Sequence, residues 1–147
     1  MNLPQVWRGP VLKSLFVAAA FALVSAAQQA YAVDLSGCWE GCWASNCTRH
    51  HGPLKATFVK CGESYDVHFR GRFFGILPFK YSVTLKVVED TGDAVTLSGS
   101  HYLGRMFGTF TYTAHATECQ FTANYDSCKD NGVFKLSKVA NFSACCD

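Results

Sequence analysis

Hydrophobic and polar residues alternate with a period of two along most of the chain after residue 32. Tyr65–Arg72, for example, places apolar or small residues at odd positions and polar residues at even positions. A strand with one buried face and one wet face gives this pattern, which is typical of antiparallel sheets. We therefore predict eight strands, at Leu35–Trp43, Leu54–Lys60, Tyr65–Arg72, Phe79–Val87, Val95–Ser98, Gly108–Thr113, Gln120–Tyr125 and Val133–Lys138.

Short turn sequences separate these strands, among them Cys61–Ser64, Asp90–Asp93 and Asp130–Gly132. Eight short-linked antiparallel strands with one apolar face can close into an up-and-down barrel, which leaves no exposed sheet edge. The predicted fold class is all-β, an eight-stranded antiparallel up-and-down barrel. A two-sheet β-sandwich is the alternative, because the sequence does not state whether the sheet closes.

The inward positions of the expected strands, taken by parity, hold many aromatic side chains with small residues between them. The aromatic ones are Trp39, Trp43, Phe58, Tyr65, Phe69, Phe79, Tyr81, Phe110, Tyr112, Phe121 and Tyr125. An eight-stranded barrel has room for its own side chains or for one small ligand. With so many large rings, we expect a largely filled interior, and we expect Trp39 to be buried and structural.

The first 32 residues have the features of a secretory signal peptide. Arg8 and Lys13 precede an apolar run that is too short to span a bilayer, and Ala30-Tyr31-Ala32 fits a cleavage site. We expect a signal peptide at 1–32, a barrel domain at 33–139 and a Cys-rich tail at 140–147, in a secreted or periplasmic protein. The alternatives are a retained membrane anchor and a lipid on Cys38, since residues 35–38 have the form of a lipobox.

Charge narrows the possible partners. The whole chain has 13 basic and 11 acidic residues, and Arg8 and Lys13 belong to the expected signal peptide, so the mature chain has a formal net charge of zero. Nucleic acids and anionic membranes are bound through a basic field. The charges are scattered singly along the sequence, so neither partner is expected. The mature chain also has no apolar run long enough for a membrane span.

The sequence Gly37-Cys38-Trp39 opens the first expected strand. A Gly-x-Trp there, followed by about eight strands, resembles the calycin superfamily, which includes the lipocalins and avidins. The resemblance implies that Trp39 closes one end of a barrel. It also implies that a basic residue of the last strand, Lys138 or Lys135, packs on the Trp39 ring as a cation–π contact.

The chain departs from both calycin families. Asn124-Tyr125-Asp126 does not reproduce the lipocalin Thr-Asp-Tyr motif, and no C-terminal helix is readable. Gly41 stands where avidins carry an Asn for biotin, so biotin binding is not expected. The chain as a whole also resembles small secreted bacterial barrel proteins of unknown function, and that resemblance implies no activity.

All eight cysteines follow the expected cleavage site, which favours disulfides in an oxidising compartment. Alternating strands bring Cys38, Cys61, Cys119, Cys145 and Cys146 to one barrel end and Cys42, Cys47 and Cys128 nearer the other. Cys38 with Cys61 and Cys47 with Cys128 are the expected neighbours, and Cys119 and Cys145 are further bridge candidates. Both groups are odd in number. Either one bridge departs from this scheme or two thiols stay free, Cys42 and one of the two tail cysteines.

Candidate chemistry is sparse. Cys47-x-x-His50 has plausible metal-ligand spacing, but no second Cys/His pair completes a zinc site, so no metal is expected. No nucleophile elbow, phosphate loop or inward carboxylate pair occurs. Cys47 with His50 or His51 could in principle act as a nucleophile and base, but a cystine is expected in an oxidising compartment. We expect no catalytic residues, no cofactor and no enzymatic activity.

The Phe73–Pro78 segment is unusually apolar for a link between two strands. By parity, Phe73 should point inward as a plug, whereas Phe74 and Ile76 should be exposed. The expected binding patch at the barrel mouth is Phe74, Ile76, Leu77 and Tyr102. The sequence thus leaves two functions open. One is a secreted binding module for a small apolar ligand or a protein partner, and the other is a filled, pocketless structural or interaction protein.

Overall fold

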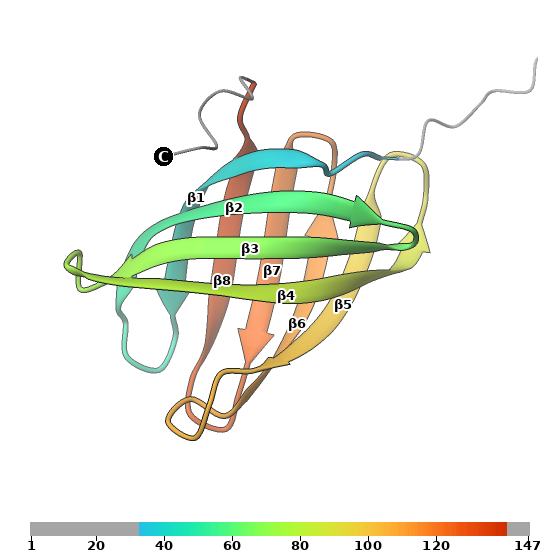
Figure 1. The fold of residues 1–147 in the computed structure, drawn as a ribbon. Helices are drawn as coiled ribbons and strands as arrows, with labels where there is room; N and C mark the ends of the chain where they lie inside the picture. Colours follow the sequence, from blue (N-terminus) through green and yellow to red (C-terminus); the bar gives the residue numbers. More distant parts are fainter. Residues whose placement is uncertain (1–32, 141–147) are drawn as a thin grey trace, which may run out of the picture.

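A computed structural model describes residues 33–140, which form one closed barrel (Figure 1). Each strand is antiparallel to its sequence neighbours, and the last strand pairs with the first. The eight-stranded up-and-down barrel is therefore confirmed, and the sandwich alternative is excluded. The strands are β1 (Gly37–Ser45), β2 (His51–Cys61), β3 (Ser64–Phe73), β4 (Leu77–Asp90), β5 (Val95–Tyr102), β6 (Thr109–Ala116), β7 (Gln120–Asp126) and β8 (Asn131–Lys138).

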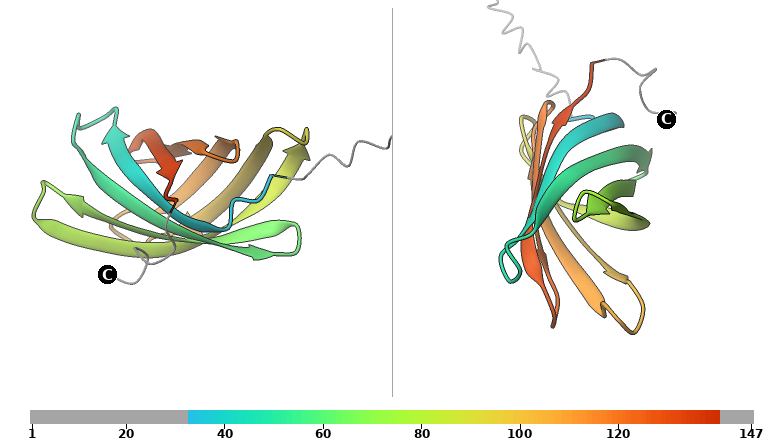
Figure 2. Two further views of the ribbon diagram at one scale, coloured as in Figure 1. Left: turned by 90° about the horizontal axis from the view of Figure 1, so that it is seen from above. Right: turned by 90° about the vertical axis from the view of Figure 1, so that its left-hand side faces the viewer.

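The two ends of the barrel differ in their connections (Figure 2). The closed end carries the β2–β3, β4–β5 and β6–β7 turns and the segment Val33–Ser36. The open end carries the β1–β2, β3–β4, β5–β6 and β7–β8 connections. In Figure 1 the β3–β4 hairpin projects beyond the rest of the sheet. The expected signal peptide at 1–32 and residues 141–147 of the expected tail lie outside the described residues.

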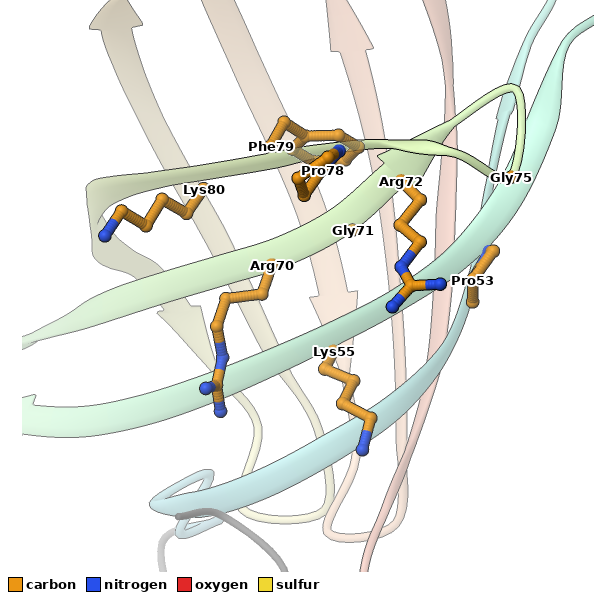
Figure 3. Close-up of a pocket in the computed structure, with 9 residues that line it drawn as sticks. All are labelled: Pro53, Lys55, Arg70, Gly71, Arg72, Gly75, Pro78, Phe79 and Lys80. Atoms are coloured by element: carbon orange, nitrogen blue, oxygen red, sulfur yellow. The ribbon is translucent and has the colours of Figure 1, made fainter. Parts of the chain in front are cut away.

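Cations align on the outer face of β2, β3 and β4. Lys55 lies opposite Arg70, and Arg70 lies opposite Lys80, so three like charges follow one another across the sheet. Arg72 follows on the same face of β3 (Figure 3). These four residues are called the basic strip. Like charges directly opposite one another destabilise a sheet. Lys55 forms an ion pair with Glu40, at 2.9 Å.

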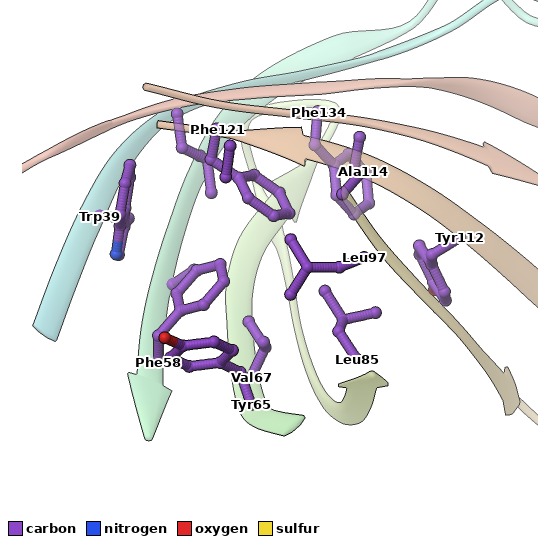
Figure 4. Packing of buried hydrophobic residues seen from close by; sticks show 14 of the residues in the cluster. Trp39, Phe58, Tyr65, Val67, Leu85, Leu97, Tyr112, Ala114, Phe121 and Phe134 are labelled. Carbon is purple, nitrogen blue, oxygen red and sulfur yellow. The ribbon is translucent and has the colours of Figure 1, made fainter. Parts of the chain in front are cut away.

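The closed half of the barrel has a dense aromatic core (Figure 4). The rings of Trp39, Phe58 and Phe121 meet at centroid distances of 5.0 to 6.3 Å. Each of the three is almost completely buried. Edge-on contacts of this kind add to the hydrophobic stabilisation that burial provides. The expectation that Trp39 is buried and structural is confirmed.

The segment before β1 completes the closed end. Leu35 is fully buried, and its carbonyl accepts a hydrogen bond from Trp39 Nε1 at 2.8 Å. Tyr65 Oη bonds both the Leu35 amide and the Val33 carbonyl. Lys138 Nζ donates to the Asp34 carbonyl at 2.6 Å and lies 5.8 Å from the centre of a Trp39 ring. The cation–π contact implied by the calycin resemblance is thus present, and it is made by Lys138.

The cysteines within residues 33–140 are arranged by end as expected, but Cys38 does not pair with Cys61, nor Cys47 with Cys128. Five of the described cysteines are free thiols, namely Cys42, Cys47, Cys61, Cys119 and Cys128. Cys38 is not a free thiol. The further candidate Cys145 lies outside the described residues.

Strand register explains why the expected pairs are absent. Cys38 lies opposite Thr57 on β2, so Cys61 is four residues further along, about 13 Å at the rise of a strand. Cys47 Sγ lies beside Asn131, whereas the sulfur of Cys128 lies beside Gly108, so the two side chains face different neighbours.

Candidate functional site

A cavity of about 560 Å³ occupies the open half of the barrel. Ten Phe, Tyr and Trp rings form most of its wall, contributed by six of the eight strands, by the β3–β4 turn and by the β5–β6 loop. They belong to Trp43, Phe73, Phe74, Phe79, Tyr81, Phe107, Phe110, Tyr112, Tyr125 and Phe134. Several of these rings are parallel to a neighbour, such as Phe79 to Tyr81 at 22° and Tyr81 to Tyr112 at 24°. The wall therefore offers flat apolar faces.

One residue of the cavity wall has a buried hydroxyl that is unpaired. Within residues 33–140, Tyr112 Oη is the buried side-chain atom with no hydrogen-bond partner. Burial raises the pKa of Tyr112 to about 12, so the hydroxyl keeps its proton at neutral pH. A buried, unpaired hydroxyl costs about 1–3 kcal/mol relative to one that is hydrogen-bonded. A ligand with a suitably placed polar atom would remove that cost.

Other polar groups of the cavity wall, those of Tyr125, Asp130 and Trp43, are hydrogen-bonded. Tyr125 Oη donates to Asp130 Oδ2 at 3.1 Å, and Asp130 Oδ1 accepts a hydrogen bond from Ser45 Oγ at 2.6 Å. Burial, followed by the neighbouring Asp130 carboxylate, raises the pKa of Tyr125. Trp43 Nε1 donates to the Arg72 carbonyl at 3.2 Å. These bonds hold the Tyr125 and Trp43 rings in place. The neighbouring hydroxyls of Tyr81 and Tyr112 are the groups left to meet a ligand.

The β3–β4 turn forms one side of the cavity mouth, and it is shorter than the sequence suggested. Phe73 still belongs to β3 and Leu77 and Pro78 already belong to β4, so the turn itself contains only Phe74, Gly75 and Ile76. The Ile76 amide donates to the Phe73 carbonyl at 3.0 Å. Phe74 and Gly75 both have positive φ, at 54° and 70°, as in a type I′ turn.

A phenylalanine in this conformation is strained. The left-handed region costs a residue with a side chain about 1–2 kcal/mol, and type I′ turns favour Asn or Asp at this position. Phe74 recovers little of that cost by burial, because 65% of it is exposed, although its ring contacts His50 at 4.4 Å. Strain of this kind often marks a functional segment.

The four residues of the expected mouth patch separate into two pairs. All four are exposed, as expected for Phe74 and Ile76, but only Phe74 and Leu77 line the cavity. Ile76 points into solvent, with 84% of its surface exposed, and Tyr102 stands outside the cavity at the end of β5. Phe73 points inward against Trp43, at 5.2 Å between ring centres, as parity predicted, but it lines the open cavity and does not plug it.

Sequence reasoning missed the β5–β6 loop as part of the mouth. Met106 and Phe107 line the cavity, and Lys129 Nζ ties this loop to the β7–β8 connection through the Met106 carbonyl at 2.7 Å. The apolar pair Met106-Phe107 within a loop was the available indication, of the same kind as the one that singled out Phe74.

The charges of residues 33–140 separate by barrel end, although they are scattered along the sequence. Cations predominate on the open-end loops and adjoining strand ends, which carry Arg49, Arg72, Lys80, Arg105 and Lys129 against Asp126 and Asp130. Carboxylates predominate at the closed end, which carries Asp34, Glu63, Asp66, Glu89, Asp90, Asp93 and Glu118 against Lys60, Lys86 and Lys138. The open end therefore carries a local excess of positive charge, although the formal net charge of the mature chain is zero.

A serine–histidine pair lies elsewhere, on the outer face of β3 and β4. His68 Nδ1 and Ser82 Oγ are 2.6 Å apart. The nearby Asp66 carboxylate bonds Thr84 and Cys61 instead, and those bonds, Thr84 first, lower the pKa of Asp66. Neither His68 nor Ser82 lines the cavity or the groove over the basic strip. The pair therefore lacks both the third group and the substrate pocket that acyl transfer requires.

Within residues 33–140, no three His, Cys, Asp or Glu side chains gather in a way that could hold a metal ion. This stretch also has no helix that is long and apolar enough to cross a bilayer. No family model, curated protein or solved structure matches the chain.

Proposed function

We propose that this chain is a secreted, non-enzymatic binding module that holds one small, largely apolar ligand in the open half of its barrel. The observation that carries the proposal is the aromatic cavity with an unpaired hydroxyl inside it. Binding pockets are typically apolar, with a few polar groups placed to fix the orientation of the ligand. Tyr112 lines this cavity, and we propose that its Oη, which is covered in the unliganded barrel, is reached by a ligand after a small shift of the neighbouring side chains.

The cavity volume favours this proposal over a pocketless structural or interaction protein. Ligand pockets usually have volumes of about 300–1,000 Å³, and the cavity measures about 560 Å³. The expectation of a largely filled interior is met at the closed end, where Trp39, Phe58 and Phe121 pack together. The rings of the open half leave the cavity between them.

The shape and chemistry of the wall suggest the class of ligand. Neighbouring, nearly parallel rings such as Tyr81 and Tyr112 favour a flat, conjugated molecule that packs against the wall they form. Tyr112 Oη can donate a hydrogen bond, so we expect a carbonyl or ether oxygen at one position of the ligand. The proposed ligand is an aromatic or polyene compound of low polarity with one such acceptor.

Two features support placing the chain near the calycins. The closed end has Gly37 next to the Trp39 plug, and Lys138 packs on the Trp39 ring.

We further propose that the mature chain begins at Val33 and carries no lipid on Cys38. A lipid there would require removal of residues 33–37, and Val33 and Leu35 are part of the core. N-terminal sequencing of secreted protein should begin at Val33.

The binding proposal can be tested with two probes of one shape, naphthalene and 2-acetylnaphthalene, by isothermal titration. Wild type should bind the ketone about 2–10 times more tightly, which corresponds to one added neutral hydrogen bond. Tyr112→Phe should bind both probes equally, because it keeps the ring and removes the hydroxyl. Absence of binding for both probes, or an unchanged preference in Tyr112→Phe, would contradict the proposal.

Leu103→Trp is the matched control. Leu103 lines the cavity at the β5–β6 loop and is only partly buried, so a larger side chain there can fill the empty volume without disturbing the closed half. Both probes should bind at least about ten times more weakly to this variant, at an unchanged thermal midpoint. Equal binding to wild type and Leu103→Trp would place the probes elsewhere on the protein.

A further inference from the structure

The β3–β4 hairpin combines an apolar tip with cations directly behind it. The hairpin tip is Phe74, Ile76 and Leu77, all exposed. The basic strip lies on the outer face of the same hairpin and of β2. Gly75 and Pro78 of the hairpin line one groove of about 630 Å³ together with the four side chains of the basic strip (Figure 3). The tip and the strip therefore form one continuous surface.

We propose that the hairpin tip and the basic strip dock the barrel, open end first, on a bilayer that contains anionic phospholipids. Apolar side chains at the tip of a hairpin can enter the boundary between headgroups and acyl chains, while nearby Lys and Arg side chains contact phosphates. The separation of charge gives the docking a direction, because the positive open end is attracted to such a surface and the negative closed end is repelled by it.

The distribution of exposed apolar side chains supports a single docking face. Apart from Val59 and Val88, every large exposed apolar residue in the described part of the chain belongs to the open end, which adds Tyr102, Met106 and Phe107 to the hairpin tip. Clustered apolar surface of this kind marks interaction sites, whereas single exposed residues such as Val88 are ordinary.

The turn backbone supports the same conclusion independently. Phe74 and Gly75 adopt a conformation for which Asn-Gly is the favoured pair. The chain instead has a strained phenylalanine that projects its ring toward solvent and His50. A large apolar side chain at this position contributes little to the stability of the isolated barrel. A contact with something outside the barrel accounts for its presence.

Docking goes beyond the proposed ligand binding and does not depend on it, since empty vesicles suffice to test it. The expectation from composition, that the neutral mature chain lacks a field for anionic membranes, considers only the sum of the charges. The attraction of a surface acts over about one Debye length, roughly 8 Å at physiological salt, so the local excess at the open end decides the outcome.

The test is co-sedimentation of the protein with phosphatidylcholine vesicles, with and without phosphatidylglycerol. Wild type should bind the anionic vesicles at least about tenfold more tightly, and added salt should remove most of the difference. Arg72→Glu combined with Lys80→Glu should weaken that binding at least about tenfold. Lys60→Glu combined with Lys86→Glu makes the same charge change at the closed end and should leave binding unchanged.

Phe74→Asn separates docking from folding. Asn tolerates the positive φ of the turn, so the variant should melt at a higher temperature than wild type while binding anionic vesicles several-fold more weakly. Val88→Ser, at a site that is similarly exposed, at 61%, but lies near the closed end, should change neither property. A parallel loss of stability and binding in Phe74→Asn would assign the ring a structural role and overturn the proposal.

Other results would also overturn it. Equal binding to neutral and anionic vesicles would remove the role of the basic strip. Binding to heparin that depends on the strip, together with vesicle binding that is absent or insensitive to the hairpin tip, would assign the strip to a soluble polyanion instead of a membrane.

Discussion

The two ends of this barrel are packed differently, since the closed end is filled by side chains and the open end holds a cavity. At the closed end, Leu35 and Trp39 fill the interior, and the polar atoms of Trp39, Tyr65 and Lys138 all have hydrogen-bond partners. At the open end, rings of similar size line a cavity, and Tyr112 Oη has no partner. Strand number and aromatic content are shared by both halves, so neither determines whether a barrel is full.

The segment before β1 accounts for much of the difference. Residues 33–36 cross the closed end and place Leu35 beneath Trp39, where its carbonyl fixes the indole. The open end has no corresponding segment among the described residues, and its mouth is bordered by loops such as Phe74–Ile76 and Leu103–Gly108. A small barrel can therefore be stabilised from one end, which leaves the other free to bind.

The largest expected effect is that of removing the indole of the closed end. Trp39→Ala should lower the free energy of unfolding by about 3–5 kcal/mol, because the densely packed rings cannot close the space left behind. Trp43→Ala, on the cavity wall, should cost at least about 1 kcal/mol less, since it enlarges a space that already exists. Urea denaturation of both variants measures this, and equal costs would contradict the comparison of the two ends.

Alkaline pH should act through the open end. Tyr112 is held protonated in the fold, with a pKa of about 12 against 10 when unfolded. The unfolded chain therefore loses its proton first, so stability is constant below pH 10 and falls between pH 10 and 12. At about 1.36 kcal/mol per pH unit, this tyrosine accounts for about 2–3 kcal/mol of the fall. Tyr112→Phe should reduce the loss by that amount in denaturation curves recorded across this pH range, and an unchanged slope would refute this role.

The smallest effect should come from enlarging one leucine at each end. Leu136→Phe should cost about 1–3 kcal/mol, because Leu136 is buried in the closed half and overpacking forces its neighbours to move. Leu103→Phe should change stability by less than about 0.5 kcal/mol, since the added atoms enter the cavity. Thermal unfolding of the two variants compares the ends directly, and a costly Leu103→Phe would mean that the open half is as full as the closed one.

The strands could be predicted because each has one dry and one wet face, and that alternation is written residue by residue in the sequence. Tyr65, Val67 and Phe69 were assigned inward by parity, and all three are buried. Parity also separated Phe73, which points inward, from the exposed Phe74. Local patterning therefore determined element type and facing.

Properties that depend on register were not predictable. The offset between Cys38 and Cys61 follows from which residues pair across β1 and β2, and no local pattern in either strand states this. The same holds for the alignment of Lys55, Arg70 and Lys80, which are far apart in sequence and adjacent on the sheet. The cavity was missed because parity shows which way the Tyr112 ring points, but not how far rings from opposite walls reach toward each other.

Closure of the barrel also bears on when the chain can fold. Trp39, near the start of β1, pairs with Lys138, the last residue of β8, so the final hydrogen-bond ladder joins the two ends of the described chain. Contacts between residues so distant in sequence slow folding, typically to milliseconds or seconds for all-β domains. Because Lys138 also covers the Trp39 ring, the plug at the closed end cannot be completed until β8 has left the ribosome. Until then, β1 keeps an unpaired edge that other strands can contact, and this interval is when the protein is most exposed to misassembly.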